Sequence, residues 1–457
     1  MNRIASRGII LVILASLLAL GFGLFVIEFI IKSGSWVVQP GSPHVFSGSQ
    51  VVSIKGGAVV DSEGVLLLDM EEEKFIYSSD EKIRKATVHW VGDRYGNVEV
   101  FALANYVDNM VEHDILNGLY AYSEKEIVTQ MTINSRMQVA ALEALGDYKG
   151  TVAIYNYKTG QLLCSVSTPT FDPEKPPEEV KETDSFYWNR FLYSTPTPGS
   201  IFKTVTLAAA LETIPDIESK TFFCNGSIEF NDVDKVTCMA PHGQMTLKDA
   251  FRKSCNCVFS QLALEIGAET LNEYVQKFGV IDSIEFDGID TSSGNYSDTR
   301  EPVFVGLGAI GQHKDQINPC AFMVFMGAIA NGGKQVMPYL IEQVTADGEV
   351  TYKADITFGD QIMSEETAQT VHAYLRNNVA QKYGDDNFPG LNVCAKTGTA
   401  EVGEEQRPNA MFAGFVEDSE YPLAFVVCVE DGGLGQDVGM PIIRDVLSVC
   451  KAIMDEG

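Results

Sequence analysis

The sequence predicts an α+β fold with a five-stranded antiparallel sheet that carries helices on its faces. Two apolar, β-rich runs at residues 151–157 and 161–167 flank a turn, which is typical of a hairpin. Three further runs, separated by turn signals, lie near the other end of the chain at residues 391–400, 410–416 and 423–430. A sheet built from both ends of a domain, around a largely helical insertion, belongs to the α+β class.

The first element is an apolar segment long enough to cross a membrane. Gly8–Ile27 carries no charge over twenty residues, and at ~1.5 Å per residue it reaches about the 30 Å of a bilayer core. Arg3 and Arg7 precede it, which predicts a cytoplasmic N-terminus and an exported remainder. A cleaved signal peptide is the alternative, but its apolar core is usually shorter. We therefore assign residues 1–32 to a short cytoplasmic tail and a single-pass anchor.

Residues 33–149 are predicted to form a small, non-catalytic, β-rich domain. Short alternating stretches such as VVSIKGGAVV and GVLLLDM are separated by charge clusters and glycine-containing turns. From Ser135 an amphipathic helix leads into the next domain, which we assign to residues 150–457. That domain ends in a second amphipathic helix over its last 20 residues.

The charge balance and the cysteines narrow the possible functions. With 33 basic against 62 acidic residues the net charge is −29, which argues against nucleic-acid binding. Nine cysteines cannot all pair within one chain. Cys224 and Cys238 flank a turn-rich segment, and the sequence leaves open whether they form a disulfide or remain free thiols. Cys255 and Cys257 have no second Cys/His pair at zinc-site spacing, so we expect no metal and no cofactor.

Three short motifs follow one another along the predicted third domain. They are Ser200-Ile-Phe-Lys203, Ser254-Cys-Asn256 and Lys396-Thr-Gly398-Thr399. Together they supply a hydroxyl nucleophile, an amine base, a polar proton relay and a cationic, hydroxyl-lined site for an anion. The series S-x-x-K, S-D-N and K-T-G is the signature of penicillin-binding proteins and serine β-lactamases. The chain resembles a class B penicillin-binding protein, a serine D,D-transpeptidase of bacterial cell-wall synthesis.

Context selects Ser200 among several matches to the same pattern. Ser200 follows the turn signal Pro198-Gly199 and opens the apolar run Val205–Leu211, which predicts a serine on the first turn of a buried helix. Lys203, three residues on, lies on the same helical face. The other matches fall in a charged stretch, on a C-terminal helix, in a hairpin turn and in a loop: Ser79–Lys82, Ser448–Lys451, Lys158–Gly160 and Ser293–Asn295.

The first two motifs have predicted roles in proton transfer. A serine hydroxyl needs a base within about 3 Å, and Lys203 is the candidate if burial or the Lys396 cation lowers its pKa. Ser254 and Asn256 are expected on a loop between two helices. The resemblance implies that Ser254 relays a proton to the leaving amine and that the Asn256 amide binds the substrate backbone.

The resemblance also assigns roles to the third motif. It implies that Lys396, Thr397 and Thr399 lie near the terminal carboxylate of the substrate. The oxyanion hole would be the backbone N–H groups of Ser200 and Thr399. Gly398 is expected to keep the strand edge open, because a side chain would block the close approach of substrate.

The resemblance covers residues 132–457 and includes phrases outside the three motifs. Thr132-Ile133-Asn134 and Gln138 resemble the family's Thr-Ile-Asp lead-in and its glutamine, with Asn in place of Asp. His242 and His313 are tempting as general bases. We expect both to be loop residues with structural hydrogen bonds.

The resemblance implies a peptidoglycan D,D-transpeptidase. Ser200 would attack the D-Ala-D-Ala carbonyl of a donor stem peptide, release D-alanine and pass the acyl group to the amine of a second stem peptide. β-Lactams would acylate the same serine. A D,D-carboxypeptidase and a β-lactamase use this serine too and remain alternatives, as does an inactive scaffold of a wall-synthesis complex. Residues 33–149 would be the family's pedestal, and the implied partner is a membrane-embedded SEDS-type glycosyltransferase.

Overall fold

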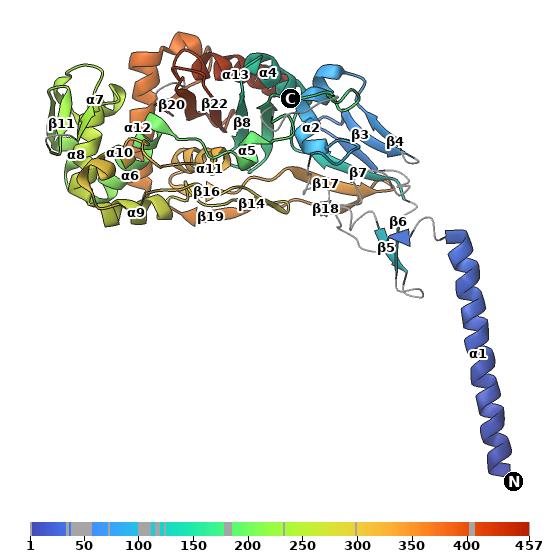
Figure 1. Cartoon of the computed structure of the whole chain (residues 1–457). Helices are drawn as coiled ribbons and strands as arrows, with labels where there is room; N and C mark the ends of the chain where they lie inside the picture. The colour runs from blue at the N-terminus through green and yellow to red at the C-terminus, as the bar shows by residue number, and fades with distance from the viewer. Residues whose placement is uncertain are drawn as a thin grey trace.

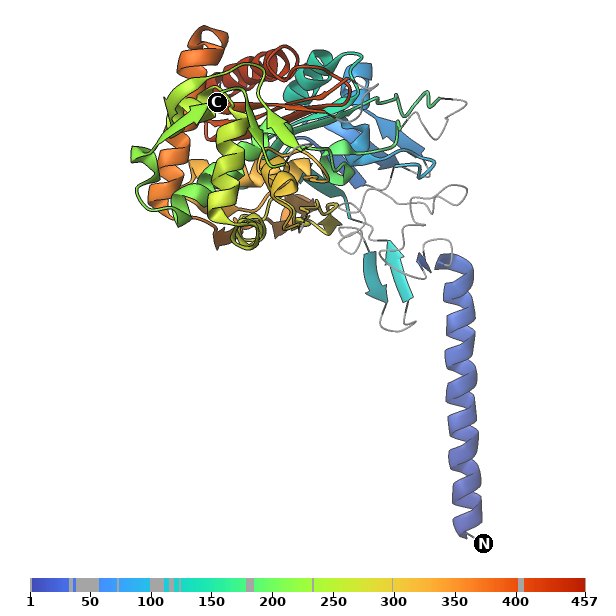
Figure 2. The ribbon, with the colours of Figure 1, turned by 60° about the vertical axis from the view of Figure 1, so that its left-hand side comes forward.

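The computed structural model describes most of the chain. The described residues are 2–32, 36–37, 57–71, 74–98, 111–114, 119–122, 125–177, 185–231, 234–297, 299–401 and 407–456. One helix, α1 (Asn2–Lys32), stands apart from the folded body in both views (Figures 1 and 2). Within it, Arg7–Ile27 has the length and composition of a membrane-spanning helix, with a mean hydropathy of 2.9. The apolar helix predicted over Gly8–Ile27 is therefore present.

The predicted five-stranded antiparallel sheet is confirmed. Its strands stand in the order β20-β21-β22-β8-β9, and every neighbouring pair is antiparallel. The N-terminal hairpin thus lies beside strands from the end of the chain, and β20 forms one edge. The strands are β8 (Gly150–Asn156), β9 (Leu162–Thr168), β20 (Val393–Ala400), β21 (Asn409–Val416) and β22 (Leu423–Val429).

Different helices bury the two faces of this sheet. Successive side chains of a strand point to opposite faces. In β22, Val426 packs in the core that contains α11 (Pro319–Ala330), whereas Phe425 packs in the core that contains α13 (Gly439–Glu456) and α4 (Ser135–Leu145). The amphipathic helices predicted from Ser135 and at the C-terminus are therefore both confirmed.

A largely helical insertion separates the two groups of strands, as predicted. It gathers at the end of the body away from α1 in both views (Figures 1 and 2). Its helices are α5 (Arg190–Tyr193), η3 (Gly199–Phe202), α6 (Lys203–Thr213), η4 (Ile217–Ser219), α7 (Leu247–Arg252), α8 (Asn256–Ile266), α9 (Ala268–Lys277), α10 (Pro302–Gly308), α11, α12 (Glu365–Asn378), η5 (Val379–Tyr383) and η6 (Asp385–Asn387). Its small hairpins pair β10 (Thr221–Cys224) with β13 (Gly243–Thr246), β11 (Ser227–Glu229) with β12 (Lys235–Thr237), β14 (Glu285–Phe286) with β15 (Ile289–Asp290), and β16 (Lys334–Val336) with β19 (Phe358–Gln361).

A second, six-stranded sheet combines distant parts of the chain. Its order is β18-β17-β7-β2-β3-β4, with β2 and β7 parallel. Four strands come from the β-rich N-terminal region, but β17 and β18 follow the helical insertion. The strands are β2 (Gly57–Val60), β3 (Leu66–Glu71), β4 (Lys74–Tyr77), β7 (Ile127–Met131), β17 (Ile341–Ala346) and β18 (Glu349–Lys353). The same region holds α2 (Glu81–Val91) and a three-stranded sheet of β1 (Trp36–Val37), β6 (Leu119–Tyr122) and β5 (Val111–Asp114).

The lead-in segment joins the two sheets. The Asn134 side chain accepts hydrogen bonds from the N–H groups of Arg136 and Met137 and so caps α4, which an aspartate could equally do. The fully buried Gln138 donates to Ala86 O over 3.1 Å and accepts from the Ser165 N–H over 2.6 Å. This glutamine therefore fixes α4 between α2 and β9.

Candidate active site

Ser200 is held on a short turn that runs directly into a buried helix. The 3-10 turn η3 covers Gly199–Phe202, so α6 begins at Lys203 and not at the serine. Gly199 has a φ of 56°, and a Cβ there would lie 2.6 Å from the carbonyl oxygen of Thr399 on β20. Glycine therefore lets the turn approach the strand this closely. The predicted buried helix is present, but the serine belongs to the turn before it.

The Lys203 amine lies at the centre of the site. Its side chain is fully buried. Nζ is 2.9 Å from Ser200 Oγ and 3.0 Å from Ser254 Oγ. It is also 2.9 Å from Ser254 O and 2.6 Å from Asn256 Oδ1. The fold therefore brings the first two motifs into direct contact around one nitrogen.

The hydrogen-bond partners of Lys203 are suited to a neutral amine. The Ser254 carbonyl oxygen and Asn256 Oδ1 can only accept hydrogen bonds, so they take two N–H donors. The orientation of the Asn256 amide follows from its Nδ2, which donates to Thr237 O over 2.8 Å. A neutral amine has two N–H groups and one lone pair, so the lone pair remains for a hydroxyl. Lys203 can therefore accept the Ser200 proton.

The pKa values of both motif lysines are lowered. Burial lowers the pKa of Lys203 to about 7. Burial also lowers the pKa of Lys396 well below its usual value, and the charges of Lys203 and Lys382 add to that effect. Of the two causes considered for Lys203, burial dominates over a neighbouring cation. A base with a pKa near the working pH is suited to general base catalysis.

Ser254 links the two lysines. It adopts the left-handed backbone region, with φ of 55°, between α7 and α8. Its Oγ lies 3.0 Å from Lys203 Nζ and 3.1 Å from Lys396 Nζ. Asn256 is the first residue of α8, so the expected loop is present but ends before the asparagine. A hydroxyl between two amines has the geometry of a proton relay.

The K-T-G motif lies on β20, at the edge of the five-stranded sheet. The Thr397 N–H donates to Tyr383 OH over 3.1 Å, and Thr399 O accepts from Gln312 Nε2 over 3.5 Å. Both threonines therefore direct backbone groups away from β21. In an antiparallel sheet the N–H and C=O of one residue point to the same side. The Thr399 N–H accordingly points off the open edge of the strand.

The structure gives a different reason for a glycine at position 398 from the one expected from the sequence. A Cβ at this position would lie 2.7 Å from Pro198 O and 2.8 Å from Met411 Cβ. These atoms belong to the segment before η3 and to β21, so the glycine allows the serine turn to pack against the strand. The structure thus explains Gly398 by internal packing, whereas the sequence suggested access for substrate.

The other matches to the motifs lie elsewhere, as predicted. Ser79–Lys82 is exposed, and Lys82 pairs with Glu143 over 2.5 Å. Lys158–Gly160 forms the turn between β8 and β9. Ser293–Asn295 lies in an irregular segment, and Ser448–Lys451 lies on α13. None of these four segments shares the contacts described for Lys203.

Residues that support the motifs were not predicted. Tyr383 is the clearest, because its buried hydroxyl lies 3.0 Å from Thr397 Oγ1. Lys382 adds positive charge near both motif lysines, and Thr237 orients Asn256. No local pattern marks these positions, since each acts on a motif that is distant in sequence.

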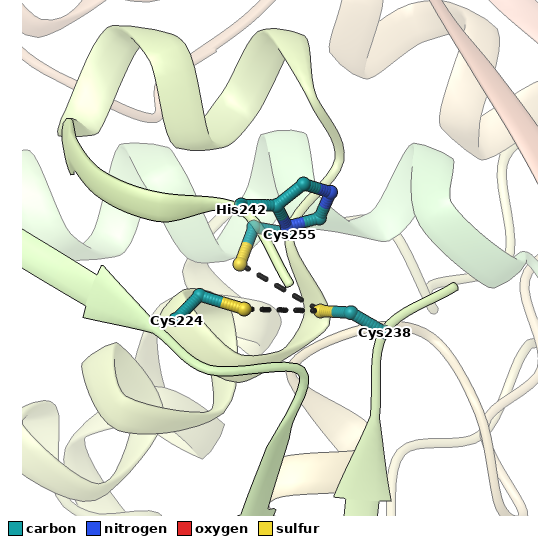
Figure 3. A group of neighbouring side chains, drawn as sticks. All are labelled: Cys224, Cys238, His242 and Cys255. Atoms are coloured by element: carbon teal, nitrogen blue, oxygen red, sulfur yellow. Dashed lines mark hydrogen bonds between the residues drawn. The ribbon is translucent and has the colours of Figure 1, made fainter. Parts of the chain in front are cut away.

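The two histidines differ in their surroundings. His313 stacks on Phe304 with ring centroids 4.4 Å apart, which is a structural contact. His242 lies instead beside three cysteine sulfur atoms (Figure 3). Its expected structural hydrogen bond is absent at Nδ1, which is buried without a partner among the described residues.

Comparison with known proteins extends the likeness beyond the motifs. The family model for the penicillin-binding protein transpeptidase domain matches residues 150–448. Peptidoglycan D,D-transpeptidase PbpA of Mycobacterium tuberculosis is 29% identical over 353 residues, which cover 69% of this chain and 71% of that protein.

Solved structures show the same fold. The D,D-transpeptidase domain of a peptidoglycan glycosyltransferase from Eggerthella lenta has a TM-score of 0.73 and 27% identity, and the match covers 87% of this chain and 98% of that one. Penicillin-binding protein A from Mycobacterium tuberculosis, solved as an imipenem acyl-enzyme, has a TM-score of 0.76 at 24% identity, covering 87% and 99%. At 24% identity, the likeness to penicillin-binding protein A shows only that the fold is shared.

Proposed function

The chain belongs to the penicillin-binding protein transpeptidase family, and on that premise we propose that it cross-links peptidoglycan through an acyl-enzyme on Ser200. The observation that carries the proposal is the 2.9 Å contact between Ser200 Oγ and the buried Lys203 Nζ. A relative named peptidoglycan D,D-transpeptidase supports a stem peptide ending in D-Ala-D-Ala as the substrate. β-Lactams are the corresponding inhibitors, because they acylate the same nucleophile.

Acylation begins with the neutral Lys203 amine. It takes the proton of Ser200 Oγ as that oxygen bonds to the carbonyl carbon of the penultimate D-alanine. The resulting oxyanion accepts hydrogen bonds from the N–H groups of Ser200 and Thr399. The Thr399 N–H is suited to this because it points off the open strand edge. Removing one such donor typically lowers the rate by about 100–1,000-fold.

Ser254 carries the proton to the leaving group. Lys203 returns its proton through Ser254 Oγ to the amine of the terminal D-alanine, the C–N bond breaks, and D-alanine departs. Lys396 stands 3.1 Å from the same hydroxyl and holds it in position. The side chains of Lys396, Thr397 and Thr399 bind the terminal carboxylate, and the Asn256 amide binds the peptide backbone. Deacylation reverses these steps with the acceptor amine in place of D-alanine.

Two related activities use the same intermediate. Water in place of the acceptor amine would make the enzyme a D,D-carboxypeptidase, and rapid hydrolysis of the penicilloyl ester would make it a β-lactamase. The family membership favours transfer to an amine. The contacts of Lys203 Nζ with Ser200 Oγ and Ser254 Oγ disfavour an inactive scaffold.

The test is labelling of the detergent-solubilised full chain with a fluorescent penicillin, followed over hours. Ser200→Ala should abolish the label, whereas Ser448→Ala, at an exposed serine of α13, should keep it. Stable label that only Ser200→Ala removes supports the proposal. Label that turns over within seconds would favour a β-lactamase, and no label would favour the scaffold. A D-Ala-D-Ala donor peptide with an added amine acceptor then separates transfer from hydrolysis by product mass.

The membrane arrangement is part of the same proposal. The apolar segment Arg7–Ile27 of α1 would anchor the protein, with its N-terminus in the cytoplasm and the catalytic domain outside. Residues 33–149 would act as a pedestal and residues 150–457 as the transpeptidase domain. Strands β17 and β18 join the sheet of the pedestal region and so tie the two parts together.

A SEDS-type glycosyltransferase is the proposed partner. Class B enzymes polymerise no glycan strands themselves, so cross-linking requires a separate polymerase at the membrane. α1 and the adjoining pedestal would form the contact surface. Mild-detergent affinity purification of the tagged full chain should recover such a polymerase. Repeated recovery without it, under conditions that preserve penicillin labelling, would argue against this partner.

A further inference from the structure

Four potential metal ligands converge beside the S-x-N motif (Figure 3). Cys224 ends β10, Cys238 follows β12, His242 precedes β13 and Cys255 caps α8. One ligand atom from each lies within 4.8 Å of the others. Cys224 and Cys255 are buried, and the other two are partly buried. These residues therefore form a compact cluster of three sulfur atoms and one imidazole nitrogen.

The sulfur separations fit a tetrahedral metal site. Zn²⁺ binds thiolate sulfur at about 2.3 Å, so two sulfurs of a tetrahedral site lie about 3.8 Å apart. Cys224 Sγ and Cys238 Sγ are 3.8 Å apart, and Cys238 Sγ and Cys255 Sγ are 3.7 Å apart. A disulfide would need a separation of about 2.05 Å, and these thiols are free. The sequence left open whether Cys224 and Cys238 form a disulfide or remain free thiols, and the structure shows free thiols at metal-binding distances.

His242 supplies an independent observation. Its Nδ1 is buried and has no hydrogen-bond partner among the described residues. Figure 3 shows one ring nitrogen of His242 on the side of the sulfur atoms. A buried imidazole nitrogen without a partner costs free energy, which a bound cation would remove.

Cys238 lies at the centre of the cluster, because its sulfur is within 3.8 Å of both the Cys224 and the Cys255 sulfur atoms. The Cys257 N–H lies 3.5 Å from Cys238 Sγ. Thiolate is the form of cysteine that binds metals. Soft sulfur ligands with one imidazole, in tetrahedral geometry, select zinc among common biological cations.

We propose that Cys224, Cys238, His242 and Cys255 form a structural zinc site that positions the S-x-N motif. Four protein ligands fill a tetrahedral zinc ion, so the site would be closed and structural rather than catalytic. Binding would displace the thiol protons and the ion would bond to three thiolates and one imidazole.

The location explains what such an ion would do. Cys255 stands between Ser254 and Asn256, the two motif residues that contact Lys203 Nζ. Thr237, which accepts from Asn256 Nδ2 over 2.8 Å, directly precedes Cys238. An ion bonded to Cys238 and Cys255 would therefore fix the neighbours of both cysteines, Thr237 and Asn256, which are the acceptor and the donor of this hydrogen bond. This consequence for the catalytic site rests on the proposed function, whereas the metal site itself does not.

Spacing in the sequence did not predict this site. The ligands are separated by thirteen, three and twelve residues, and two short hairpins bring them together. The expectation of no metal came from the absence of a second close Cys/His pair. A search for such pairs cannot find ligands that only tertiary packing assembles.

Metal content tests the site directly. The full chain, purified in detergent with a phosphine reductant, should contain about one zinc ion per chain by elemental analysis. Cys238→Ser and His242→Ala should each lower that content severalfold, whereas Cys164→Ser, at a buried cysteine on β9, should not. Metal-free protein titrated with Co²⁺ should show thiolate-to-metal charge-transfer bands and tetrahedral d–d bands. A reduced wild-type chain that binds neither ion, or a Cys224–Cys238 disulfide in the protein as isolated, would overturn the proposal.

The positioning role has its own measurement. Removing zinc with a chelator, below the unfolding temperature, should slow penicillin acylation about tenfold or more, and added zinc should restore it. The pH midpoint of acylation should also rise, because loosening Ser254 and Asn256 exposes Lys203 to water. Unchanged rate and midpoint after zinc removal would overturn the positioning role. Ser200→Ala should lose acylation but keep its zinc, so failure of the proposed reaction and failure of the metal site are distinguishable.

Discussion

The catalytic chemistry proposed for this chain depends on one buried amine. Lys203 Nζ contacts two hydroxyl groups and two oxygens that can only accept, and it has no exposed surface. Burial disfavours the charged form, while the two acceptors still satisfy the N–H groups of the neutral form. In the proposed mechanism, the residue is therefore prepared as a base before substrate arrives.

The pH dependence of acylation should report this lysine. Because burial lowers the pKa of Lys203 to about 7, and the neutral amine is the active base, acylation should increase with pH through about pH 7 and then level off. Lys203→Arg should lower the rate by roughly 100–10,000-fold at every pH, because arginine stays protonated. Stopped-flow measurement with a fluorescent penicillin gives these rates. Lys158→Arg in the hairpin turn is the control, and a flat profile in the wild type would contradict this role.

Tyr383 offers a second prediction at the residue scale. Its hydroxyl accepts from the Thr397 N–H over 3.1 Å and lies 3.0 Å from Thr397 Oγ1. Tyr383→Phe should lower acylation about tenfold, because the Thr397 hydroxyl loses its orientation, and should lower the free energy of unfolding by about 1 kcal/mol. The control is Tyr374→Phe. The Tyr374 hydroxyl lies 3.0 Å from Glu218 Oε1, so its removal should lower stability without changing acylation. Equal acylation rates in the two variants would argue against a role for Tyr383 in the site.

At the scale of elements, the site depends on how closely η3 packs against β20. A Cβ at Gly199 would lie 2.6 Å from Thr399 O on β20, and a Cβ at Gly398 would lie 2.7 Å from Pro198 O, just before η3. The same K-T-G letters at Lys158–Gly160 form a hairpin turn whose glycine packs against Met337 instead, where a Cβ would lie 2.3 Å from the carbonyl oxygen. A motif therefore becomes a site only on an element that packs beside the others.

Gly398→Ala tests this contact. The added methyl meets Pro198 O and Met411 Cβ, so η3 and β20 must separate. We expect a loss of roughly 1–3 kcal/mol in the free energy of unfolding and at least a tenfold loss of acylation rate. Gly348→Ala is the control. An added Cβ there would meet no atom within 4 Å, but the φ of +79° is unfavourable for alanine. This variant should therefore lower stability without slowing acylation. Chemical denaturation and penicillin labelling measure the two effects, and a normal acylation rate in Gly398→Ala would refute the argument.

At the scale of the whole molecule, one sheet joins regions that are far apart in sequence. β17 and β18 follow the helical insertion, yet they pair beside β7 of the N-terminal region. Forces on the N-terminal region are thereby transmitted to the catalytic part through backbone hydrogen bonds. If the N-terminal region serves as the proposed pedestal, this pairing would hold the active site at a set distance from the proposed membrane anchor.

The orientation of the anchor is a prediction for the whole chain. With Arg3 and Arg7 before the apolar segment, an N-terminal tag should be protected from protease added to intact spheroplasts, whereas a C-terminal tag should be digested. The chain should leave the membrane fraction in detergent but not in high salt. Immunoblotting of both tags measures the result. Loss of the N-terminal tag from the mature protein would indicate a cleaved signal peptide instead.

Local patterns in the sequence determined much of the fold. The strand runs around residues 151–167 and 391–430, the buried helix after Ser200 and the amphipathic C-terminal helix all appear as predicted. Turn residues and apolar periodicity act over a few neighbouring residues, so they can be recognised in the sequence without knowledge of the segments that pack against them. The order of the three motifs likewise predicted the chemistry and favoured Ser200 over the other matches.

Only the tertiary structure decided how those residues behave. The lowered pKa of Lys203, the support of Thr397 by Tyr383, the packing reason for Gly398 and the convergence of Cys224 with Cys255 all depend on contacts between distant segments. Burial and electrostatic environment are properties of everything that surrounds a side chain. The sequence predicts the reacting groups, and the packing of the elements sets their protonation, reach and orientation.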